Sequence, residues 1–113
     1  MRQVFQHLTN PEITAALHNI LRRYSLVFVT EHIYLGPNAK PNIDMPHGPG
    51  TRVPDESGVQ IDLPPFSTNA RTIGDIAYAP NEVLRTWAVQ GTGVRPCAIS
   101  SPLERTPAPV LPV

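Results

Sequence analysis

The sequence predicts a small single domain of the α+β class, with an N-terminal helix packed on a short, mostly antiparallel sheet. Two observations lead there: apolar residues with a helical period over 10–23, and a stretch rich in β-branched and aromatic residues over 26–35. The chain has 113 residues, a length typical of one domain with a modest core. We expect that domain over residues 1–100, with an extended loop over 36–58 and a proline-rich C-terminal arm over 101–113.

The helix has a clear start signal. Thr9 is the expected N-cap, and Glu12 three residues later completes a capping box. Pro11 suits the first turn, because its missing N–H would lack a partner there. The helical spacing places one apolar stripe on the face that we expect to be buried, formed by Ile13, Leu17, Ile20, Leu21 and Tyr24.

The stretch over 26–35 is the clearest strand. Its first half is apolar on both faces and its second half alternates. This pattern predicts a central strand that is covered on both faces at its first end and on one face at the other.

The later elements carry weaker signals. Alternation predicts a half-buried strand over 59–63, and a short strand is expected over 72–78. Residues 82–90 are interpreted as a helix with Asn81 as its N-cap and Gly91 as its left-handed C-cap, and a strand is the alternative.

The charge of the chain is low and balanced. Nine basic and nine acidic residues give a net charge of zero, and charged residues make up 16% of the chain, against a usual ~25%. There is no basic stripe, so we expect no nucleic-acid partner. Zero net charge gives little repulsion between copies, which suits a protein that lives in an assembly.

The cysteine content and the hydropathy of the chain indicate the cellular compartment in which we expect the protein. The single cysteine, Cys97, excludes an intrachain disulfide and a cysteine-based zinc site. No apolar run reaches the length of a signal peptide or a membrane span. We therefore expect a cytoplasmic protein, or a component of a particle assembled in the cytoplasm, that is not secreted by a signal peptide. No cofactor or metal motif is present, and none of these ligands is expected.

Asp44 and His47, in the stretch "DMPHGPG", best fit a chemical role. A loop rich in glycine and proline can bring an imidazole and a carboxylate together for general base catalysis, with His32 on the strand as a third member. A small hydrolase or nuclease-like enzyme is therefore the alternative function. However, no completing ligand or nucleophile motif accompanies the pair, and we predict that neither Asp44 nor His47 is catalytic.

The proline-rich segments favour a different role. Five prolines in residues 36–58 and four in 101–113 rule out helices and favour extended geometry. The sequence also allows a last short strand over 94–100. The apolar residues of the two segments are spaced as single anchors that we expect to bury against a partner, namely Ile43, Met45, Val53, Val110, Leu111 and Val113.

Together these features favour a non-enzymatic structural or assembly protein. It would bind neighbouring subunits through its extended proline-rich segments, as a small virus or phage particle component does. The expected partners are other copies of the chain or a larger assembly partner, with neither nucleic acid nor membrane.

Overall fold

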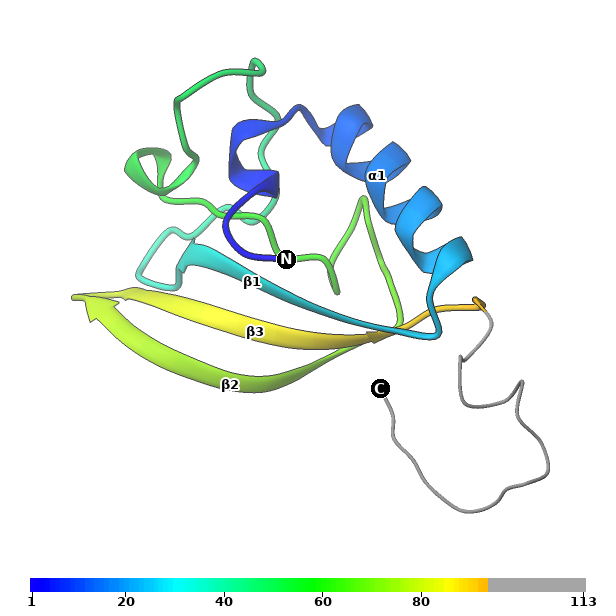
Figure 1. Cartoon of the computed structure of the whole chain (residues 1–113). Coiled ribbons are helices and arrows are strands. Elements are labelled where there is room, and N and C mark those ends of the chain that lie inside the picture. The colour runs from blue at the N-terminus through cyan, green and yellow to red at the C-terminus, as the bar shows by residue number, and fades with distance from the viewer. Residues whose placement is uncertain (94–113) are drawn as a thin grey trace, which may run out of the picture.

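A computed structural model describes residues 1–93 and confirms the α+β prediction. The elements in chain order are the 3-10 helix η1 (Phe5–His7), the helix α1 (Asn10–Arg23), the strand β1 (Leu26–Tyr34), the 3-10 helix η2 (Val53–Asp55), and the strands β2 (Ala70–Ala79) and β3 (Glu82–Gln90). The strands form one antiparallel sheet in the order β1-β3-β2. Figure 1 shows α1 and the loop segments on one side of this sheet, with β2 farthest from the helix.

Several predicted features lie outside the described residues. These are the strand over 94–100, Cys97, and the C-terminal arm with Val110, Leu111 and Val113.

The helix α1 begins as its sequence predicts. The Thr9 Oγ1 accepts a hydrogen bond from the Glu12 amide at 3.2 Å, and the Glu12 carboxylate accepts one from the Thr9 amide at 2.9 Å. Ile13 and Leu17 are buried. The prediction that Tyr24 continues this stripe is wrong: it follows the last helical residue, its backbone is extended, and its side chain is 56% exposed.

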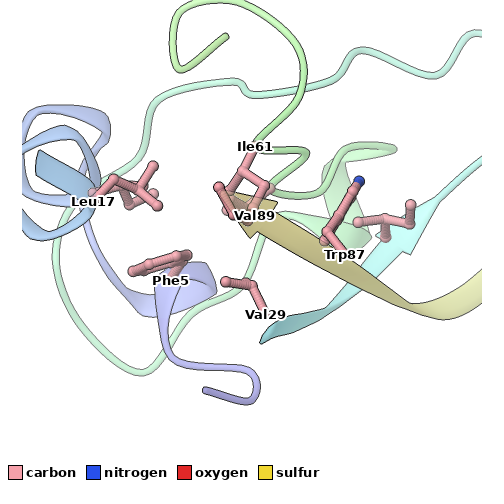
Figure 2. Close-up of a cluster of buried hydrophobic side chains, with 9 residues drawn as sticks. Phe5, Leu17, Val29, Ile61, Trp87 and Val89 are labelled. Carbon is pink, nitrogen blue, oxygen red and sulfur yellow. The ribbon is translucent and has the colours of Figure 1, made fainter. Parts of the chain in front are cut away.

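The core lies between the sheet and α1. Figure 2 shows Leu17 of the helix, with Phe5 and Ile61, facing Val29 of β1 and Trp87 and Val89 of β3. Fully burying a side chain of this kind contributes about 1.5–3 kcal/mol. The buried cluster consists of Phe5, Ile13, Leu17, Val29, Ile33, Val59, Ile61, Trp87 and Val89.

The interpretation of residues 82–90 as a helix is wrong, and the alternative holds. These residues form β3, the central strand of the sheet, and they alternate between its two faces. Asn81 is not a helix cap: it adopts a φ of 64° in the two-residue turn between β2 and β3, where asparagine tolerates the left-handed conformation. This turn joins β2 to β3. The short strand expected over 72–78 is confirmed, because it lies within β2.

Gly91 also differs from its predicted role. It follows a strand, and its amide donates to the Ser25 carbonyl at 3.0 Å, while the Thr92 amide donates to the Leu21 carbonyl at the end of α1 at 2.7 Å. A Cβ on Gly91 would lie 2.1 Å from the Tyr24 carbonyl oxygen. Glycine is required here because the chain passes so close to the end of the helix.

The strand predicted over 59–63 is also wrong, and its half-buried alternation does not hold, because Gln60 is buried between Val59 and Ile61. Val59 and Ile61 are fully buried. In place of a neighbouring strand, the Asn42 side chain pairs with this backbone: its Oδ1 accepts from the Gln60 amide at 2.7 Å and its Nδ2 donates to the Gln60 carbonyl at 2.8 Å. The segment therefore satisfies its buried backbone through a side chain of the long loop.

Candidate protein-interaction surface

The sheet has one face turned away from α1, which we call the open face. Along β1, Val29, Glu31 and Ile33 are buried toward the core, so the alternating residues between them point the other way. The strand register extends this set to the neighbouring strands. The open face comprises Leu26, Phe28, Thr30, His32 and Tyr34 of β1, Arg71, Gly74, Ile76, Tyr78 and Ala79 of β2, and Glu82, Leu84, Thr86, Ala88 and Gln90 of β3.

Large apolar side chains of the open face are exposed to solvent. Phe28 is 51% exposed, Ile76 68% and Tyr78 64%. The prediction that the first end of β1 is central and covered on both faces is therefore wrong for the described part of the chain. β3 is the central strand, and Phe28 lacks the cover that its sequence pattern indicates.

The polar side chains of the open face pair with one another. The Thr30 and Thr86 hydroxyls lie 2.7 Å apart, and the His32 Nε2 lies 2.8 Å from the Glu82 Oε1. The Tyr78 ring stacks on the His32 ring with centroids 4.5 Å apart. These contacts pair four polar side chains within the sheet, and they leave the apolar side chains and the exposed Arg71 as the surface available to a partner.

The two outer edges of the sheet differ. The outer edge of β1 is covered by the chain itself, since the Gln3 amide donates to the Thr30 carbonyl at 2.7 Å and the Thr30 amide donates to the Met1 carbonyl at 2.8 Å. Farther along, Gly58 bridges Ile33. The outer edge of β2, which we call the free edge, pairs with no strand within residues 1–93.

β2 is exposed along almost its whole length. Each residue from 71 to 78 is exposed. Register shifts against β3 at Ile73 and Tyr78 mark bulges, which add one unpaired residue each. Between them, Gly74–Ala77 stays in regular register with β3. The free edge thus presents a short regular stretch flanked by two exposed apolar side chains.

The loop over 36–58 is fastened to its own domain by Arg52, whose side chain is fully buried. Its Nε donates to the Ile43 carbonyl at 2.7 Å, and its Nη2 donates to the Leu8 carbonyl at 2.7 Å and to the Asn10 Oδ1 at 2.9 Å. Burial lowers the pKa of Arg52, while the nearby Asp44 and Glu31 act in the opposite direction. Arg52 therefore attaches the loop to the start of α1 and to the residues just before it.

The three predicted anchors of this loop lie partly exposed on the domain. Ile43, Met45 and Val53 are each intermediate between buried and exposed. Their role in binding a partner stays a prediction.

Asp44 and His47 lie at the start of α1 and contact different groups. The Asp44 Oδ1 accepts from the Asn10 amide at 2.8 Å, and the His47 Nδ1 lies 3.0 Å from the Glu12 Oε2. His32 lies on the open face, opposite to the core-facing Glu31 and Ile33. The structure therefore does not bring the three residues of the enzyme alternative together. Within residues 1–93, no group of three or more His, Cys, Asp or Glu side chains is placed to hold a metal ion.

Asp44→Ala is expected to lower the free energy of unfolding by about 0.5–2 kcal/mol, because the first-turn amide of Asn10 loses its acceptor at the positive end of the helix dipole. Thermal unfolding at neutral pH measures the change. Asp55→Ala, an exposed carboxylate in η2, is the matched control and should change little. Equal stability of the Asp44→Ala variant and the wild type would contradict this role.

Compared with protein families, with curated proteins and with solved structures, the chain shows no match. Among the described residues, no helix has both the length and the apolar character needed to cross a membrane. The geometry of the sheet is thus the basis for a functional proposal.

Neither the open face nor the free edge was predicted from the sequence. The apolar first half of "LVFVTEHIY" was the available signal, because it indicates cover on both faces. The position of that strand in the sheet could not be derived from the pattern.

Proposed function

We propose that this chain is a non-enzymatic assembly protein that binds a neighbouring protein subunit through the open face and the free edge of its sheet. The observation that carries the proposal is the exposure of Phe28, Ile76 and Tyr78 on an ordered, hydrogen-bonded sheet. Phe28 lies toward one end of this face and Ile76 and Tyr78 toward the other, on either side of the Thr30–Thr86 pair, and large exposed apolar side chains on one ordered face favour a protein interface. The setting that we propose is an assembled particle, such as a small virus or phage.

The energetics support a partner on this surface. An enclosed aromatic side chain buries about 150–250 Å², and apolar burial contributes about 25 cal/mol per Å². Covering the exposed halves of Phe28 and Tyr78 would therefore contribute about 2 kcal/mol each. Thr30, Thr86, His32 and Glu82 are already paired, so a partner would cover them with little unsatisfied hydrogen bonding. The exposed Arg71, in the same row as Phe28, would need an acceptor from that partner.

The proline-rich segments take a secondary place in this proposal. The partly exposed side chains of Ile43, Met45 and Val53 offer additional anchor points on the loop. We propose that the arm over 101–113 adds contacts of the same kind through Val110, Leu111 and Val113.

The enzyme alternative finds no support in the described residues. Asp44 and His47 each contact the first turn of α1, and His32 pairs with Glu82 on the other side of the sheet. A general base needs a substrate group within hydrogen-bond reach and a partner that orients it. We therefore keep the assembly role as the proposed function.

Site-specific photo-crosslinking tests this proposal. A photoreactive phenylalanine analogue replaces Phe28 on the open face in the full chain, expressed in the cells that make it. The same analogue at Ala15, exposed on α1, is the control. We expect an adduct of discrete mass from position 28 and none from position 15. Absence of an adduct at position 28, or equal adducts at both positions, would overturn the proposal.

A further inference from the structure

We infer that two copies of this chain join along their β2 strands, antiparallel about a two-fold axis, so that two three-stranded sheets become one sheet of six strands. This inference rests on the proposed function and names the partner of the free edge as a second copy.

The chemistry of β2 fits strand pairing. An unpaired edge presents a row of N–H and C=O groups that another strand can bind. Natural edges are commonly protected by charged side chains, above all lysine, by proline and by bulges. The sequence of β2, "ARTIGDIAYA", contains neither lysine nor proline, and its two bulges lie outside Gly74–Ala77. The stretch Gly74–Ala77, between the two bulges, keeps the regular register that a new ladder needs. Ile73 and Tyr78 flank this stretch and supply apolar contact to the incoming strand.

The closed edge on β1 decides which pairing is possible. Met1–Gln3 and Gly58 already cover the outer edge of β1. In the described part of the chain, β2 has the one outer edge that is open for pairing. The β2 edge of one copy can therefore pair only with the β2 edge of another. Identical surfaces that meet in this way form a two-fold interface that closes, whereas pairing of two different edges would continue into a fibre. Within residues 1–93, the geometry thus favours a closed dimer over open-ended stacking of sheets.

Electrostatics do not oppose a partner of the same kind. β2 carries one basic residue, Arg71, and one acidic residue, Asp75, and the chain as a whole has no net charge. Asp75 is already neutralised by Arg85, with the Nε 2.8 Å from the Asp75 Oδ1 and the Nη2 2.8 Å from the Oδ2. Two copies therefore meet without opposing net charge. At the two-fold axis, the exposed Ile76 side chains of both copies would lie close together and extend the open face.

Sedimentation velocity of the full chain tests this dimer. At about 100 μM we expect a species of twice 12.4 kDa, in a concentration-dependent equilibrium with the monomer. The double variant Ile73→Lys/Ile76→Lys places like charges along the paired edges and should raise the dissociation constant at least ~100-fold. The control Phe28→Lys changes the open face on β1, away from the free edge, and should leave the dimer intact.

Hydrogen exchange on the wild type gives a second measurement that needs no variant. The amides of residues 74–77 should exchange more slowly in concentrated than in dilute solution, while those of α1 should not change.

Each contrary outcome has a distinct meaning. A monomeric wild type, a dimer that survives the double lysine variant, oligomers larger than two, or a dimer lost in Phe28→Lys would overturn the paired-edge dimer. A monomer that still forms an adduct with another protein through position 28 would overturn this inference and leave the proposed function standing. A β2 dimer without an adduct at position 28 would overturn the proposed function as stated and leave the paired-edge dimer standing.

Discussion

Replacing Arg52 with methionine is expected to lower the free energy of unfolding by about 3–5 kcal/mol. The guanidinium is 0% exposed and makes every bond that its planar fork allows. Besides its bonds to Ile43, Leu8 and Asn10, its Nη1 donates to the Gln6 carbonyl at 3.1 Å and to the Phe5 carbonyl at 3.4 Å. One side chain thus joins the loop over 36–58 to η1 and to the residues that lead from it into α1.

The size of this effect follows from what methionine leaves behind. Methionine fills much of the same space but donates no hydrogen bond, so the carbonyl groups around it lose their partner in a buried site. Each unsatisfied buried polar group costs about 1–3 kcal/mol, and partial relaxation keeps the total below the sum. Arg52→Lys keeps the charge but not the fork, and should fall between the wild type and Arg52→Met.

Urea unfolding of the three proteins measures the difference. Arg22→Met, at an exposed arginine of α1 with a single bond to Asn19, is the matched control and should change stability by less than about 0.5 kcal/mol. A loss of less than about 1 kcal/mol for Arg52→Met would show that the loop is held by other contacts.

The elements with local signals could be predicted from the sequence. The capping box of Thr9 and Glu12 and the following helical period lie within a few residues of each other, so they identify α1 directly. The β-branched run does the same for β1. Residues 82–90 carry no local signal that separates a helix from a strand. Val83, Trp87 and the residues between them fit a helical face and an alternating strand alike.

The contacts that organise the loop could not be predicted, because they join residues far apart in the chain. Arg52 bonds backbone groups more than 40 residues before it, and Asn42 pairs with Gln60 18 residues after it. A single arginine or asparagine in a loop carries no periodic signal. The open face could not be predicted for the same reason. The exposure of Phe28 depends on strand order, which apolar alternation alone does not specify.

Glu31 is the buried acid of the domain, and its geometry makes stability depend on pH. Its Oε2 accepts from the amides of Val4 and Phe5, both at 3.1 Å, while its Oε1 is buried without a hydrogen-bond partner. Burial raises the pKa of Glu31 to about 7, against the opposing effect of these amides and of the Arg52 charge. The folded protein thus keeps a proton on Glu31 at pH values where the unfolded chain, with a pKa near 4.5, has released it.

The direction of the pH effect follows from this difference. Since the folded state binds more protons between about pH 4.5 and 7, the contribution of Glu31 is fully present below pH 4.5 and is lost as the pH rises through 7. A pKa difference of about 2.5 at 1.36 kcal/mol per unit amounts to about 3 kcal/mol. Glu31→Gln stays neutral at every pH, and its carbonyl oxygen can accept the same two amides.

We therefore expect Glu31→Gln to match the wild type near pH 4.5 and to exceed its stability by about 3 kcal/mol at pH 8. Urea unfolding of both proteins at several pH values measures this, and subtracting the two curves removes the titration of groups common to both. Glu56→Gln, a partly exposed carboxylate beside Lys40, is the matched control and should follow the wild type. Parallel curves for Glu31→Gln and the wild type would contradict the prediction, because they would mean that Glu31 releases its proton equally easily in the folded and unfolded chains.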